Sequence, residues 1–114
     1  MKRLRWESLK RKKFAILPEK DLNKRRRLYI EMLCEDLKLS ENVKEKAERI
    51  LEKIEKNIDL GGKNPRSIVA SIVYIASTLC KEKRTQEEVT DTMRTCLATM
   101  HKYNRIVEKY LPVD

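Results

Sequence analysis

The chain has 114 residues, which is enough for one domain with a modest hydrophobic core. It contains only two glycines and three prolines, aromatic residues make up 5% and charged residues 39%, so the composition favours helices over a β-sheet. No apolar run is long enough to span a membrane, and none follows the basic first residues as a secretory signal would require. The composition therefore predicts an all-α protein, and we expect neither a signal peptide nor a membrane partner.

The three cysteines, Cys34, Cys80 and Cys96, form no C-x-x-C pair and leave an odd count. All three lie in helical or apolar surroundings, which favours buried, reduced thiols over a disulfide framework or a zinc site. No metal site is expected.

The net charge of +9 is concentrated in the first quarter of the chain. Residues 1–27 contain 12 Lys and Arg against 3 Asp and Glu, whereas residues 28–114 contain 15 of each kind. A basic segment joined to a neutral body is typical of an arm that binds a polyanion. We therefore divide the chain into a basic N-terminal arm, residues 1–17, and a helical domain, residues 18–114.

The arm contains two basic clusters with Trp6 and Phe14 interleaved. Basic side chains contact phosphates, and an aromatic ring stacks or packs on a partner, so we expect Trp6 to bind a partner. The alternative is a solvated tail in which Trp6 folds back on the body. The candidate DNA contacts in the arm are Lys2, Arg3, Arg5, Lys10, Arg11, Lys12 and Lys13.

A first helix is predicted from Pro18 to about Leu37. Its C-terminal half carries an apolar face suited to a core. Its N-terminal half carries four consecutive basic residues, Lys24 to Arg27, and is expected to project from the body as a basic rod. The candidate DNA contacts on this rod are Arg25 and Arg26.

A second helix is predicted from Glu41 to about Ile58, with Ser40 as its cap and Gly61-Gly62 as the C-cap and turn behind it. Its apolar residues recur at intervals of three and four, as in a helix with one buried face. These residues are Val43, Ala47, Ile50, Leu51, Ile54 and Ile58.

The third predicted helix begins at Pro65, with Asn64 as its cap, and runs to about Cys80. From Ile68 to Leu79 its apolar residues surround the helix instead of forming one stripe, and small residues allow close approach of neighbouring backbones. This pattern predicts a buried central helix surrounded by amphipathic helices.

Two further helices are predicted, from Thr85 to about Arg94 and from about Leu97 to Leu111. Thr85 and Glu88 form a capping box at the start of the first. A short helix, a tight turn and a longer helix make a helix-turn-helix candidate, whose second helix can present its first turns to the major groove. The DNA contacts expected from this unit are Arg94, Thr95, Thr99, His101, Lys102 and Arg105.

The run from Gly62 to Ser77, GKNPRSIVASIVYIAS, and the run from Lys83 to Val89, KRTQEEV, resemble a cyclin-like repeat of transcription factor IIB and its archaeal counterpart. The resemblance covers roughly residues 28–111 and implies one five-helix, cyclin-like repeat ending in a helix-turn-helix. Family members usually carry a zinc ribbon and two such repeats. This sequence has no cysteine pair for a ribbon, and it has His101 where the family's recognition helix usually has arginine.

The resemblance implies an adaptor or modulator of transcription initiation that binds double-stranded DNA with TATA-binding protein, RNA polymerase or both. The expected location is the cytoplasm, associated with the nucleoid, for an archaeal or viral source and the nucleus for a eukaryotic one. Two alternatives stay open: a protein-binding cyclin-box module with no direct DNA role, and a homodimer that rebuilds the two-repeat arrangement.

Catalysis finds no support in the sequence. His101 is the single histidine and has no nucleophile or second metal ligand beside it, and the glycines at 61 and 62 lack a phosphate-loop motif. We expect a protein that is not an enzyme and needs no cofactor.

Overall fold

The computed structural model describes residues 22–60 and 63–111. The predicted arm, the predicted start of the first helix at Pro18 and the Gly61-Gly62 turn lie outside these residues. The described part contains five helices and no strand, which confirms the all-α prediction. The helices are α2 (Leu22–Asp36), α3 (Glu41–Asn57), α4 (Pro65–Leu79), α5 (Gln86–Met93) and α6 (Leu97–Glu108).

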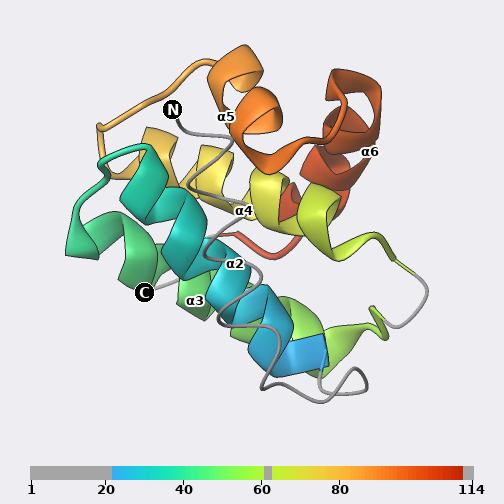
Figure 1. Cartoon of the computed structure of the whole chain (residues 1–114). Helices are drawn as coiled ribbons and strands as arrows, with labels where there is room; N and C mark the ends of the chain where they lie inside the picture. The colour runs from blue at the N-terminus through green and yellow to red at the C-terminus, as the bar shows by residue number, and fades with distance from the viewer. Residues whose placement is uncertain (1–21, 61–62, 112–114) are drawn as a thin grey trace.

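Helix α4 is the centre of the fold. It packs against α2, α3, α5 and α6, and Figure 1 shows it between the α2–α3 pair and the α5–α6 pair. From Ser67 to Ser77 every residue except Tyr74 is buried, so the predicted central helix is confirmed. The Asn64 side chain caps this helix by accepting hydrogen bonds from the backbone N–H groups of Arg66 at 3.0 Å and Ser67 at 3.4 Å.

The prediction that the first helix projects as a basic rod is wrong. Arg26 is only 4% exposed, and its Nη1 lies 3.0 Å from Oε2 of Glu55 on α3. Arg27 is more exposed and pairs with Glu52 at 3.6 Å. The glutamates of α3 therefore hold this part of α2 along α3, and Arg26 is not a surface candidate for DNA contact.

The bounds of α3 agree with the prediction, but the caps at both ends differ from it. Ser40 occupies the N-cap position, but its side chain makes no capping bond and donates instead to Glu82. The helix ends at Asn57, with Ile58 as its C-cap, and thus stops before the glycine pair. Extended backbone at Ile58 ends the helix without a left-handed residue.

Helix α6 also ends earlier than predicted, at Glu108 instead of Leu111. The N–H groups of Lys109 and Tyr110 bond to carbonyls three residues back, at 3.2 and 3.0 Å, so the last residues tighten into a turn. Tyr110 and Leu111 still pack against the core.

The three thiols are free, but only Cys34 is buried, while Cys80 is half-buried and Cys96 is exposed. The expectation of three buried thiols is therefore wrong for Cys96. Each of the helices in the described ranges is too short or too polar to cross a membrane.

Candidate nucleic-acid interface

The helix-turn-helix begins with the predicted capping box at Thr85. The Thr85 hydroxyl accepts from the backbone N–H of Glu88 at 3.1 Å, and the Glu88 carboxylate accepts from the backbone N–H of Thr85 at 3.0 Å. Two amides that a helix start leaves without partners are thereby satisfied. Gln86 is the first residue inside the helix.

The turn between α5 and α6 is closed by left-handed backbone at Arg94, where φ is 60°. The N–H of Arg94 bonds to the carbonyl of Asp91 at 3.2 Å, and that of Thr95 reaches the carbonyl of Thr90 at 3.0 Å. This is the hydrogen-bond pattern of a Schellman C-cap, a position usually taken by glycine. The Arg94 side chain is exposed at the turn.

One face of α6 is fixed to α4. Met100, Tyr103 and Val107 are buried at helical spacing. Polar contacts add to this packing: the Tyr103 hydroxyl accepts from the backbone N–H of Asn64 at 3.3 Å, and Ser71 Oγ donates to Asn104 Oδ1. The rotation of α6 about its axis is thus set by both apolar and polar contacts.

The opposite face of α6 is open to solvent. Ala98, His101, Lys102 and Arg105 are exposed and line one hollow of about 300 Å³. Their positions are i, i+3, i+4 and i+7, so they form one stripe along the helix. This stripe, which we call the α6 face, carries two fixed positive charges and one imidazole.

The structure brings three of the six predicted helix-turn-helix contacts together, namely His101, Lys102 and Arg105. Thr95 is half-buried, and its Oγ1 lies 2.6 Å from Oγ of Ser67 on α4. Thr99 is also half-buried, and its hydroxyl lies 2.9 Å from Sγ of Cys96. Both hydroxyls are therefore already engaged by other side chains of the protein.

The other candidates lie elsewhere. Arg25 and Arg26 are on the first turns of α2, which Figure 1 places at the opposite side of the molecule from α5 and α6. The candidates of the arm, Lys2 to Lys13 with Trp6, lie outside the described residues.

Two residues of this region were missed by the sequence analysis. Gln86 contacts His101 on the α6 face, although the sequence indicated only its place at the helix start. Cys96 is exposed at the N-cap of α6, where hydrogen bonds from the hydroxyl and then the backbone N–H of Thr99 lower the pKa of its thiol. The place of Cys96 directly before a predicted helix was the sequence signal that could have indicated its lowered pKa.

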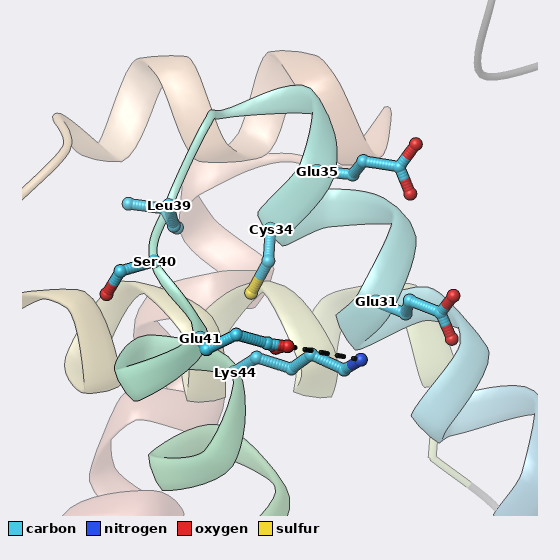
Figure 2. Close-up of a pocket in the computed structure, with 7 residues that line it drawn as sticks. All are labelled: Glu31, Cys34, Glu35, Leu39, Ser40, Glu41 and Lys44. Carbon is cyan, nitrogen blue, oxygen red and sulfur yellow. Dashed lines mark ion pairs between the residues drawn. The ribbon is translucent and has the colours of Figure 1, made fainter.

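A second hollow, of about 220 Å³, lies between the end of α2 and the start of α3. Figure 2 shows Cys34 at its centre, with the sulfur pointing toward Glu41 and Lys44, which pair at 3.9 Å. Burial raises the pKa of the Cys34 thiol to about 12, so the thiol is protonated and a poor nucleophile. Within residues 22–60 and 63–111, no three His, Cys, Asp or Glu side chains are grouped to hold a metal.

Comparison with known proteins places these features in a family. The family model described as transcription factor TFIIB repeat matches residues 19–109. Transcription initiation factor IIB of Pyrococcus abyssi is 42% identical over 82 residues, which are 71% of this chain and 27% of that protein. Transcription initiation factor IIB 7 of Halobacterium salinarum is 37% identical over 81 residues, which are 70% of this chain and 25% of that protein. The chain thus spans about a quarter of the length of these curated relatives.

Proposed function

The chain belongs to the family of transcription factor TFIIB repeats, and we propose that it acts in transcription initiation by contacting promoter DNA together with TATA-binding protein, RNA polymerase or both. This role needs no reaction at a catalytic centre, and the named relatives are initiation factors. The cyclin-like fold supplies a rigid body around α4.

The α6 face is the observation that carries the proposal. A helix in the major groove contacts base edges with the side chains of its first turns and phosphates with basic residues. Ala98 and His101 lie in the first turns, and Lys102 and Arg105 flank them on the same stripe. The contacts of α6 with α4 hold this stripe outward.

The basic arm would add phosphate contacts that do not depend on the DNA sequence. Residues 1–17 contain 7 Lys and Arg against 1 Glu, a balance of +6 out of the net +9, and phosphate neutralisation gives affinity together with a strong dependence on salt. We infer that the arm supplies most of the electrostatic attraction to DNA. The α6 face then fixes the position of the protein on the duplex.

The second candidate function is a protein-binding cyclin-box module without DNA contact. The contacts of Thr95 with Ser67 and of Thr99 with Cys96 favour it, because they engage two hydroxyls that were expected to contact bases. A direct binding experiment separates the two functions.

The experiment measures binding of the whole chain to a fluorescent TATA-containing promoter duplex by anisotropy, with and without TATA-binding protein. We expect Lys102→Glu combined with Arg105→Glu to weaken binding by about 5- to 150-fold, which corresponds to about 1–3 kcal/mol of binding free energy. The melting temperature should stay within a few degrees, because both side chains are exposed.

The matched control is Arg49→Glu combined with Lys56→Glu, on exposed positions of α3. It changes the net charge equally but leaves the α6 face intact. Equal weakening by both double variants would show that only total charge matters. Undiminished DNA binding by the α6 variant would favour the protein-binding module.

A further inference from the structure

Gln86, the first residue of α5, connects the central helix to the α6 face. Its Nε2 donates a hydrogen bond to the hydroxyl of Tyr74 on α4 at 3.3 Å. Its Oε1 contacts Nε2 of His101 on α6. Three side chains from three helices therefore form one hydrogen-bonded chain that ends at the surface.

The orientation of the Gln86 amide determines which nitrogen of His101 carries hydrogen. An amide oxygen can only accept, so the nitrogen of His101 that faces it must be the N–H donor. In a neutral imidazole the other nitrogen is then an acceptor. The contact thus selects the Nε2–H tautomer and leaves Nδ1 as the acceptor.

This acceptor is the only one among the side chains of the α6 face. Ala98 has no polar group, and Lys102 and Arg105 can only donate. In the major groove, guanine and thymine offer acceptors to such donors, whereas the amino groups of adenine and cytosine need an acceptor. Nδ1 of His101 is the group on this face that can receive an amino hydrogen.

We propose that Tyr74 and Gln86 act as positioning residues that hold His101 as the Nε2–H tautomer, so that Nδ1 reads the amino group of an adenine or a cytosine. The inference rests on the proposed function, because it requires α6 to enter a groove. It assigns a base preference at one position of the DNA site, adenine or cytosine over guanine or thymine.

The tautomer can be measured without DNA. His101 is the only histidine in the chain, so long-range ¹H–¹⁵N correlation spectra of the ¹⁵N-labelled full chain, without a histidine tag and in mildly alkaline buffer, report on it alone. We expect the pattern of the Nε2–H form. Gln86→Glu, which keeps an acceptor, should preserve the pattern, and Gln86→Leu should shift it toward the Nδ1–H form. A wild-type spectrum of the Nδ1–H form would overturn the inference.

The base preference is measured by selection from duplexes with a randomised site. We expect adenine or cytosine to be preferred by about fivefold or more at one position, which is the lower end of the discrimination that one base contact provides. His101→Ala and Gln86→Leu should abolish the preference. The control Lys102→Gln should weaken binding to all sequences alike and keep the preference.

The outcomes separate the two proposals. A chain that binds no DNA refutes the proposed function and base reading with it. A chain that binds DNA without this preference, or with a preference that survives His101→Ala, refutes base reading by His101 and leaves the proposed function standing.

Discussion

Glu82 and Ser40, 42 residues apart in the sequence, join the loop after α4 to the loop before α3. The backbone N–H of Ser40 donates to Oε1 of Glu82 at 2.9 Å, and the Ser40 hydroxyl donates to the other carboxylate oxygen. Close by, the Arg84 guanidinium donates to the carbonyl of Leu37 at 3.0 and 3.2 Å. The charged connection between α4 and α5 is thus a tie that satisfies backbone groups at the junction of α2 and α3.

This tie makes stability depend on pH in a defined direction. The Ser40 hydroxyl and then the Ser40 N–H lower the pKa of Glu82 from its ordinary value of 4.5. A carboxyl whose pKa is lower in the folded state stabilises the fold above its unfolded pKa, and this contribution is lost as the pH falls through the folded pKa. We expect Glu82→Gln to lower the melting temperature at neutral pH and the difference from wild type to shrink in acid.

Thermal unfolding monitored by circular dichroism, from neutral pH into acid, measures the melting temperatures of both proteins. The control is Glu45→Gln, at an exposed position of α3. A melting-temperature difference for Glu82→Gln that stays constant into acid would contradict the assignment.

The ion pair of Arg26 with Glu55 is expected to contribute more to stability than the neighbouring pair of Arg27 with Glu52. Removing one partner of a buried pair leaves a charge without compensation, which costs about 3–5 kcal/mol. We expect Arg26→Ala to lower the free energy of unfolding by about 3 kcal/mol, the lower end, because Glu55 is 13% exposed. Arg27→Ala breaks a pair that is about half exposed and should cost about 1 kcal/mol or less. Urea unfolding measures both, and equal costs would contradict the burial of Arg26.

The free cysteines should differ in reactivity. A thiolate is the reactive form, so Cys96 should be alkylated first in the folded chain and Cys34 only after unfolding. Thr99→Ala removes the hydroxyl that lowers the pKa of Cys96 and should slow its alkylation at neutral pH. Mass spectrometry of timed samples identifies each site. Faster labelling of Cys34 than of Cys96 would rule out the described burial.

The arm should determine the salt dependence of DNA binding. Replacing Lys10, Arg11, Lys12 and Lys13 with glutamine should make the slope of log K against log salt shallower, by about 0.9 for each phosphate that the arm no longer neutralises. The slope is read from anisotropy titrations at several salt concentrations. The control variant Arg49→Gln removes one charge from α3 and should leave the slope nearly unchanged. An unaltered slope in the arm variant would exclude a role for these residues.

The sequence by itself determined the features whose partners are close along the chain. The cap at Asn64 and the capping box at Thr85 each join residues two or three apart, and the apolar periodicity of α4 needs no knowledge of its neighbours. Backbone geometry alone brings such groups together. The order of the five helices and the central place of α4 followed from these local patterns.

Only the tertiary structure decided the use of polar residues that meet distant partners. Arg26 is read as a basic surface residue until α3 places Glu55 beside it, 29 residues away. Ser40 is a cap by its position, yet Glu82 engages its hydroxyl. Gln86 contacts His101 because α5 and α6 both pack on α4 and on each other. A charged or polar side chain has several partners of similar energy available to it, and the packing of the helices selects among them.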